Sequence, residues 1–166
     1  MLLVFGAGRQ VGRALVNRAG SAARGFDRTA CDICNAGGVS RELCRPQRYL
    51  PWSNCAAFTP STVPRLSPFA VNSRGAEIIA RATAEQGLPI IHLSTDYVYA
   101  GAAAAPHRED EPIAPLDVFR ASKAAGDAAV ASANPTHLLF QVSWVFGIYG
   151  ANFVKTMLCL VRQQND

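Results

Sequence analysis

Hydrophobic and polar residues follow two different periods along this chain. Short, uninterrupted apolar runs are typical of strands buried on both faces of a sheet, and we expect such strands at residues 2–5, 89–95 and 136–144. Apolar residues that recur every three to four positions are typical of amphipathic helices. We expect helices at residues 10–20, 70–87, 115–133 and 152–163. This alternation indicates an α/β fold with a doubly wound parallel sheet and helices on both faces.

The stretch from residue 29 to residue 68 interrupts this alternation. It is rich in cysteine, arginine, proline and serine, and it predicts no strand beyond a few residues around Trp52. An irregular loop of that length is unusual inside a compact α/β domain. We therefore hypothesise that small shifts of reading frame have altered this stretch, which translation of the coding DNA in its other frames would test.

The composition is that of a globular protein with one domain and a sizeable core. Of the 166 residues, 49% are hydrophobic and 17% are charged. No apolar run approaches the roughly 20 residues that a membrane span needs, and the first residues lack the basic leader of a signal peptide. The net charge is +4, but the arginines are scattered and have no interleaved aromatic residues. We expect a cytoplasmic protein with neither a membrane nor a nucleic acid as partner.

The cysteines form a weak motif. Cys31 and Cys34 make a C-x-x-C pair that is followed by Cys44 and Cys55. A zinc site would need a second close pair, or histidines at ligand spacing, and the sequence has neither. We interpret the cysteines as unpaired thiols and expect no metal.

A glycine-rich turn follows the first expected strand and opens the first expected helix. Gly6, Gly8 and Gly12 would let the backbone approach a pyrophosphate that binds at the positive end of the helix. The alternative is a glycine-rich turn without a ligand. Asp27 and Arg28 follow at about the distance where an acid binds a ribose hydroxyl or an arginine binds an added phosphate. An exposed pair of turn residues is the alternative there.

A second group of chemically active residues lies at the end of the strand 89–95. Ser94 and Thr95 would place hydroxyl groups in the crevice where α/β sheets bind ligands, although they could also simply cap the strand. Phe119 and Lys123 follow on an expected helix at i, i+4 spacing, so they share one face of it.

Six segments, taken together and in order, resemble one family. They are GAGRQVG (6–12), NCAAFT (54–59), AVN (70–72), LSTDYVYAG (93–101), EDEPIAPLDVFRASKAAGD (109–127) and SWVFGIYGANFVKTML (143–158). In this order and context they resemble the dTDP-4-dehydrorhamnose reductases, the RmlD-like branch of the extended short-chain dehydrogenases/reductases. The resemblance covers residues 1–20 and 54–158 well.

The resemblance implies a Rossmann-like oxidoreductase that uses NADPH or NADH to reduce the 4-keto group of a dTDP-deoxyhexose. Such a reaction completes dTDP-L-rhamnose for polysaccharide synthesis, with a dTDP-sugar as substrate, and the family allows a homodimer. Residues 1–150 would form the NAD(P)-binding domain, and residues 151–166 would begin the substrate-binding region.

The resemblance also implies roles for individual residues. Thr95, Phe119 and Lys123 occupy the catalytic positions, and Lys123 would also hold the nicotinamide ribose. The cofactor would be bound by Gly6, Gly8, Gln10, Val11, Gly12, Asp27, Arg28, Asn54, Ala56, Ala57 and Asn72. The substrate would be bound by Asp96, Tyr97, Val98, Trp144 and Asn152.

The sequence departs from the family pattern mainly at its catalytic positions. Phe119 stands where the family carries the tyrosine that donates a proton, and its loss would cost about 10²–10⁴-fold in rate. Tyr97 and Tyr99 are the candidates to replace that hydroxyl. Because the chain ends at Asp166, we expect most of the substrate-binding lobe to be missing. Three interpretations remain open: a reductase with impaired activity, a catalytically silent dinucleotide-binding or regulatory protein, and a non-functional gene fragment.

Overall fold

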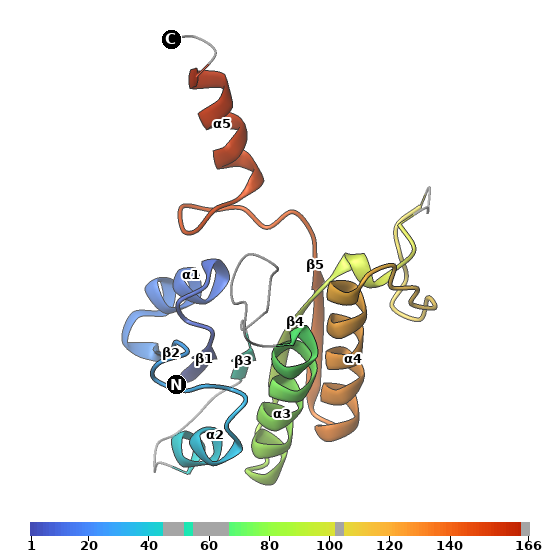
Figure 1. The fold of residues 1–166 in the computed structure, drawn as a ribbon. Helices are drawn as coiled ribbons and strands as arrows, with labels where there is room; N and C mark the ends of the chain where they lie inside the picture. The colour runs from blue at the N-terminus through green and yellow to red at the C-terminus, as the bar shows by residue number, and fades with distance from the viewer. Residues whose placement is uncertain (45–51, 55–66, 102–104, 164–166) are drawn as a thin grey trace.

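The computed structural model describes residues 1–44, 52–54, 67–101 and 105–163, and its centre is a parallel sheet (Figure 1). The strands are β1 (Leu2–Phe5), β2 (Ala23–Phe26), β3 (Trp52–Asn54), β4 (Ile90–Thr95) and β5 (His137–Val142). Their order across the sheet is β2-β1-β3-β4-β5, and all neighbours are parallel. The chain therefore forms the predicted doubly wound α/β fold of the Rossmann type.

Helices cover both faces of this sheet. They are α1 (Gln10–Ala19), α2 (Ala36–Leu43), α3 (Ala76–Glu85) and α4 (Val118–Ala133). The chain also forms α5 (Phe153–Gln163), which does not cover the sheet, and short helical turns at η1 (Gly20–Ala22), η2 (Ala70–Gly75) and η3 (Asp96–Val98). The connection through α1 runs from β1 outwards to β2, whereas the later connections run in the opposite direction. Because such crossovers are right-handed, α1 lies on one face and α2, α3 and α4 lie on the other.

The centre of the sheet explains why the short apolar runs become strands. Leu3, Val4 and Phe5 of β1 are completely buried, and so is Ile90 of β4. Apolar side chains of α2, α3 and α4 complete this core. A strand with β-sheet neighbours on both sides and helices on both faces buries every side chain, which is why β1 shows no alternation.

The expected helix at 70–87 is divided in two. Its first part, η2, is a π-helix, and α3 continues it. A side chain at Gly126 of α4 would come within 2.1 Å of the Asn72 carbonyl oxygen. The two helices therefore approach closely at the π turn, which periodicity alone did not predict.

The expectation of an irregular stretch from 29 to 68 is wrong for its first part. Asn35 caps α2 by accepting a hydrogen bond from the Gly38 N–H (3.1 Å), and Val39 and Leu43 of α2 are buried in the core. The hypothesis of a shifted reading frame stays a prediction, which translation of the coding DNA would test. The strand around Trp52 is confirmed as β3, and residues 45–51 and 55–66 lie outside the described residues.

The last helix differs from the others in its surroundings. None of the side chains of α5 is buried, and large apolar ones such as Phe153 and Leu158 are exposed. Figure 1 shows α5 standing away from the sheet, beyond the end of β5. Across the described ranges, no helix is long and apolar enough to cross a membrane.

Candidate functional site

The glycine-rich turn joins β1 to α1 at the carboxyl edge of the sheet. Gly6 has a φ of 80°, a conformation that glycine adopts without strain. A Cβ at Gly12 would lie 2.2 Å from the Gly6 carbonyl oxygen, so the first turn of α1 packs directly on the strand end. The first turn of α1 carries no acidic residue, so its N–H groups and its dipole are available to an anion.

The glycine-rich turn is also hydrogen-bonded to the end of β2. The N–H groups of Gly6 and Ala7 both donate to the Phe26 carbonyl oxygen, at 2.9 and 3.0 Å. A pocket of about 260 Å³ lies at this junction. It is lined by Ala7, Gly8, Arg13, Gly25, Asp27 and Ala30. The structure thus brings Gly8 and Asp27, two of the predicted cofactor residues, to one pocket.

Asp27 and Arg28 differ in their contacts and in their position relative to the pocket. The Asp27 Oδ1 atom accepts hydrogen bonds from the Thr29 N–H (3.0 Å), the Thr29 hydroxyl (2.7 Å) and the Ala30 N–H (2.9 Å). The hydrogen bonds from the Ala30 N–H and the Thr29 side chain lower the pKa of the Asp27 carboxyl below its usual range. Arg28 instead pairs with Asp32, with 3.6 Å between Nε and Oδ2, and does not line the pocket.

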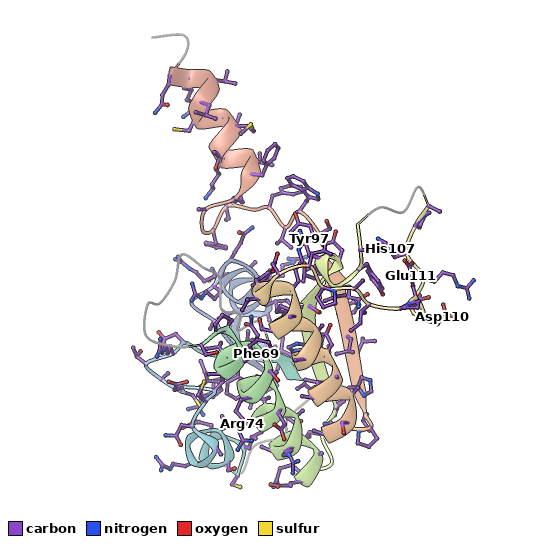
Figure 2. All side chains as sticks on the ribbon, turned by 45° about the vertical axis from the view of Figure 1, so that its right-hand side comes forward. Phe69, Arg74, Tyr97, His107, Asp110 and Glu111 are labelled. Atoms are coloured by element: carbon purple, nitrogen blue, oxygen red, sulfur yellow. The ribbon has the colours of Figure 1, made fainter. Side chains whose placement is uncertain are left out.

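The predicted substrate residues at the end of β4 form a short turn. The Thr95 hydroxyl donates to Asp96 Oδ1 (3.2 Å) and accepts from the Tyr97 N–H (3.3 Å). Val98 is completely buried and its carbonyl oxygen accepts a hydrogen bond from the Ala114 N–H (2.8 Å), so this predicted substrate residue presents no surface to a ligand. Tyr97 is 45% exposed, and the Arg120 guanidinium lies 4.8 Å from its ring centroid. Figure 2 shows Tyr97 on the same side of the molecule as the loop that carries His107 and Glu111.

Lys123 points into the protein, between α4 and β4. It is 2% exposed, and its Nζ atom donates to the Leu93 carbonyl oxygen at 2.7 Å. Phe119, one turn earlier on α4, is half-buried. Burial of an ammonium group needs such a hydrogen bond and a nearby counter-charge.

Asp127, one helical turn after Lys123 on α4, belongs to a buried polar cluster that was not predicted from the sequence. Asp127 accepts a hydrogen bond from the Ser94 hydroxyl (2.5 Å), and its other oxygen lies 3.4 Å from His92 Nε2. Burial and the Lys123 charge lower the pKa of His92, although Asp127 opposes this. The sequence does contain a pattern that could have indicated this cluster. His92 and Ser94 lie two residues apart on a strand, so they share one face of it, and Lys123 and Asp127 lie four residues apart on a helix, so they share one face of that helix.

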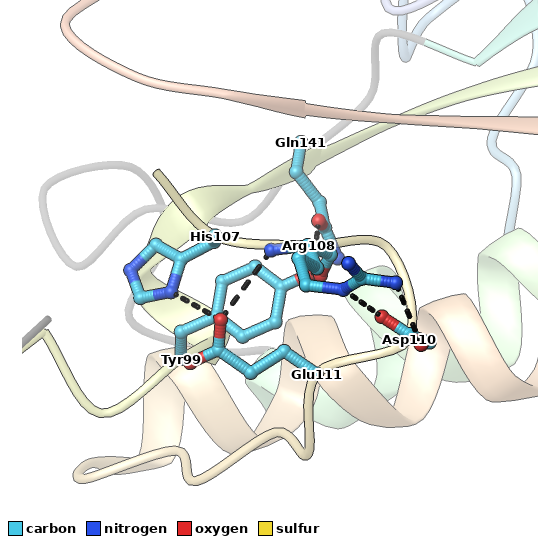
Figure 3. A network of polar contacts seen from close by, with 6 residues as sticks. All are labelled: Tyr99, His107, Arg108, Asp110, Glu111 and Gln141. Carbon is cyan, nitrogen blue, oxygen red and sulfur yellow. Dashed lines mark hydrogen bonds and ion pairs between the residues drawn. The ribbon is translucent and has the colours of Figure 1, made fainter. Parts of the chain in front are cut away.

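The two candidates for the missing hydroxyl have different surroundings. Tyr99 is buried, its hydroxyl donates to Gln141 Oε1 (2.7 Å), and its ring stacks on His107 at 4.4 Å between centroids (Figure 3). Glu111 holds the other side of His107, with 2.9 Å between Oε2 and Nδ1. The Tyr99 hydroxyl is therefore already hydrogen-bonded within the protein, whereas Tyr97 is exposed.

The segment after β5 lies against α1. Gln10 Nε2 donates to the Val145 carbonyl oxygen (3.2 Å), while Val11 beside it is half-buried. Trp144 is exposed and packs edge-on against Phe153.

Asn152 holds the start of α5, donating to the Gly147 carbonyl oxygen (2.9 Å) and accepting from the Lys155 N–H (3.2 Å). The hydrogen bond between Gln10 and Val145 brings the segment that carries Trp144 and Asn152 towards the start of α1.

The remaining predicted residues fall elsewhere. Asn72 is buried and its side-chain amide donates to the Ser122 hydroxyl at 2.9 Å, which joins η2 to α4. Ala56 and Ala57 lie outside the described residues, and Asn54 is described only as the last residue of β3. Cys31 is buried in the core and the Cys34 thiol donates to the Ala70 carbonyl oxygen (3.3 Å).

Comparison with known proteins identifies relatives of this chain. A family model described as "RmlD substrate binding domain" matches residues 1–166. The chain is 38% identical to the dTDP-4-dehydrorhamnose reductase of Escherichia coli K12 and 35% identical to that of Aggregatibacter actinomycetemcomitans. In both cases 99% of this chain is matched to 58% of the relative, so the chain spans about three-fifths of their length.

Solved structures show the same fold. The dTDP-4-dehydrorhamnose reductase of Bacillus anthracis in complex with NADP superimposes with a TM-score of 0.87 at 29% identity, covering 98% of this chain and 59% of that one. The Bordetella bronchiseptica enzyme WbmG in complex with NAD has a TM-score of 0.83 at 17% identity, over 98% of this chain and 59% of that one.

Proposed function

This chain belongs to the RmlD substrate-binding-domain family, and on that premise we propose that it is the dinucleotide-binding part of a dTDP-4-dehydrorhamnose reductase. Residues 1–150 would form the NAD(P)-binding domain and residues 151–166 would begin the substrate-binding region. The reaction would be the reduction of the 4-keto group of a dTDP-deoxyhexose in the cytoplasm, towards dTDP-L-rhamnose. The observation that carries the proposal is the glycine-rich turn packed on the end of β1 beside an acid at the end of β2.

The site fits a dinucleotide on its own geometry. Gly12 leaves no room for a side chain against Gly6, and the first turn of α1 presents its N–H groups without a competing acid. A pyrophosphate at this point would be stabilised by those N–H groups and the helix dipole. When bound, the reduced nicotinamide supplies the hydride.

The residues at the end of β4 and on α4 would act on the sugar. Thr95 presents a hydroxyl at the carboxyl edge of the sheet, and this hydroxyl would turn from Asp96 Oδ1 to donate to the keto oxygen. Lys123 supplies a buried positive charge one helical turn after Phe119. A positive charge at that distance would favour the phenolate form of a tyrosine and so assist proton transfer. Phe119 has no hydroxyl, so we propose that this chain binds its cofactor but turns over slowly.

A catalytically silent dinucleotide-binding homologue is the second candidate. It is favoured by Phe119 together with Tyr99, because the buried Tyr99 hydroxyl is already bonded to Gln141 and to the Arg108 carbonyl oxygen. A silent homologue would keep the dinucleotide site and lose only the proton donor.

The test compares the wild-type chain with Phe119→Tyr. Saturable binding of NADH or NADPH, followed by nicotinamide fluorescence, is expected for both proteins. With a dTDP-4-keto-deoxyhexose as substrate, Phe119→Tyr should raise the turnover rate by about 10²–10⁴-fold. Phe140→Tyr is the matched control, because it adds the same hydroxyl to an exposed position on β5 and should leave the rate unchanged.

Each outcome separates the candidates. Wild-type turnover equal to that of Phe119→Tyr would show that our interpretation of Phe119 is wrong. Binding without turnover in either protein would favour the silent homologue. A folded chain that binds neither nucleotide would refute the proposed function.

A further inference from the structure

We propose that Tyr97 donates the proton in this chain, in place of the hydroxyl that Phe119 lacks, and that Arg120 positions the Tyr97 ring. The inference rests on the proposed reductase activity and adds the residue that carries its slow turnover. A role for Tyr97 in sugar binding alone is the alternative that the test must separate from it.

The backbone of Tyr97 is fixed at the end of β4. Thr95 is the last residue of that strand, and its hydroxyl accepts a hydrogen bond from the Tyr97 N–H (3.3 Å). Val98, the next residue, is completely buried, and its carbonyl oxygen accepts from the Ala114 N–H (2.8 Å). Tyr97 is therefore anchored on both sides, two residues from the hydroxyl that would bind the keto oxygen.

The ring of Tyr97 reaches from this turn to the start of α4. The Arg120 guanidinium lies 4.8 Å from the ring centroid, and Arg120 directly follows Phe119 on the helix. Figure 2 shows Tyr97 near the end of α4 at which the helix begins. The ring therefore connects the turn that carries Thr95 with the helical turn that carries Phe119, where the hydroxyl is missing.

Asp117 holds Arg120 in the position that this stacking requires. Its Oδ1 atom caps α4 by accepting a hydrogen bond from the Arg120 N–H (2.8 Å), and its Oδ2 atom pairs with Arg120 Nε at 3.0 Å. One carboxylate thus fixes both the backbone and the guanidinium of Arg120. A guanidinium held in this way restricts the aromatic ring beside it through a cation–π interaction.

Other hydroxyl groups around the end of β4 and the start of α4 are less accessible. Ser94 and Ser122 are buried, and the Tyr99 hydroxyl is already bonded to Gln141. Tyr97 is 45% exposed, and within the described part of the chain no hydrogen bond engages its hydroxyl. It is therefore the phenol that a substrate at this edge of the sheet can reach.

The reaction balances with Tyr97 as the acid. The keto carbon receives a hydride, with its two electrons, from the reduced nicotinamide, and the π electrons of the carbonyl move to its oxygen. That oxygen takes the proton of the Tyr97 hydroxyl, which leaves a phenolate. The charge of Arg120 stabilises the negative charge that develops on the phenol oxygen. Because Tyr97 is exposed, the phenolate regains a proton from water.

The test measures kcat and KM for a dTDP-4-keto-deoxyhexose in the wild-type chain and in Phe119→Tyr, each with and without Tyr97→Phe. In the wild type, Tyr97→Phe should lower kcat by at least about 10-fold, towards the lower end of the effect of a general acid. In Phe119→Tyr the helix supplies the proton, so Tyr97→Phe should change kcat by less than about 2-fold. Tyr97→Phe removes only an exposed hydroxyl, so the variant should fold.

Arg120 provides a second variant. Arg120→Leu should lower kcat of the wild type and leave kcat of Phe119→Tyr nearly unchanged, because it acts through the Tyr97 ring. Arg120→Lys retains a cation over the ring and should retain most of the wild-type rate. Tyr149→Phe is the matched control, since it removes a phenol hydroxyl that accepts a hydrogen bond from Asn17 of α1 (2.6 Å), and it should leave both kinetic constants unchanged.

The outcomes distinguish this inference from the proposed function. An equal loss of kcat in both backgrounds, or a rise in KM alone, would show that Tyr97 binds the sugar without donating a proton. Tyr97→Phe with the wild-type rate would also overturn the inference, and so would a wild-type chain that is inactive while Phe119→Tyr is active. The proposed function survives each of these results. If neither the wild type nor Phe119→Tyr turns over, the proposed reductase activity fails and the inference fails with it.

Discussion

Replacement of Gly12 by alanine tests the geometry on which the dinucleotide site depends. The added Cβ would meet three backbone atoms: the Gly6 carbonyl oxygen at 2.2 Å, the Gly6 carbonyl carbon at 2.8 Å and the Ala7 Cα at 2.9 Å. Ordinary contact begins at 3.4 Å, so α1 would have to move away from the end of β1 by about 1 Å. Backbone atoms cannot avoid a clash by changing rotamer.

The magnitude follows from two opposing effects. Overpacking of this kind costs about 1–3 kcal/mol, and the upper part of that range applies where the contacts are with backbone. Alanine stabilises a helix relative to glycine by about 1 kcal/mol. We expect a net loss of about 2 kcal/mol in the free energy of unfolding, which a domain with about 5–15 kcal/mol tolerates.

Cofactor binding should weaken as well. A shift of the first turn of α1 moves the N–H groups that would hold the pyrophosphate, so the affinity for NADH should fall by at least about 10-fold, or 1.4 kcal/mol. Urea unfolding and fluorescence titration measure the two effects on the same protein.

Gly37→Ala is the matched control for this prediction. Gly37 lies in the first turn of α2, and a Cβ there would meet only the Asn35 Oδ1 atom at 3.6 Å. It should gain up to about 1 kcal/mol and bind NADH like the wild type. A Gly12→Ala protein with wild-type stability and wild-type affinity would refute the argument from close approach.

Two further predictions concern the buried polar groups. Asn134→Ala removes hydrogen bonds to the Thr83 hydroxyl (2.9 Å), the Leu88 carbonyl oxygen (3.0 Å) and the Thr136 N–H (2.9 Å), and urea unfolding should show a loss of about 2–4 kcal/mol. His92 is held neutral because its pKa is lowered in the fold, so the unfolded chain binds an extra proton below the ordinary value of 6.5. The free energy of unfolding should therefore fall as the pH drops from about 7 to about 5, and His92→Gln should flatten that part of the profile.

The sequence predicted those elements whose hydrophobic period is complete. The run Leu2–Phe5 and the stripe that begins at Gln10 appear as β1 and α1 with almost the expected bounds. α2 was missed because Gly37 and Gly38 weaken its helical propensity, and only Val39 and Leu43 mark its buried face.

The site was less accessible to sequence reasoning than the fold. The choice between Asp27 and Arg28 depends on which side chain the turn directs to the pocket, and the backbone of Thr29 and Ala30 decides that. The cluster of Asp127 and Lys123 depends on which face of α4 meets β4, which requires the packed structure.

Lys123 shows why a motif residue is weak evidence for activity in this chain. Its Nζ atom bonds the Leu93 carbonyl oxygen between His92 and Ser94, and Asp127 of the same helix bonds Ser94. These contacts join α4 to β4, so they explain why a lysine is buried here without requiring that it act in catalysis. Phe119 has no such ambiguity, because phenylalanine fills the space of a tyrosine and lacks only the hydroxyl group that would donate the proton. A difference in turnover rate between the wild-type chain and Phe119→Tyr would therefore be evidence about catalysis. The presence of Lys123 is first of all evidence that α4 packs on β4.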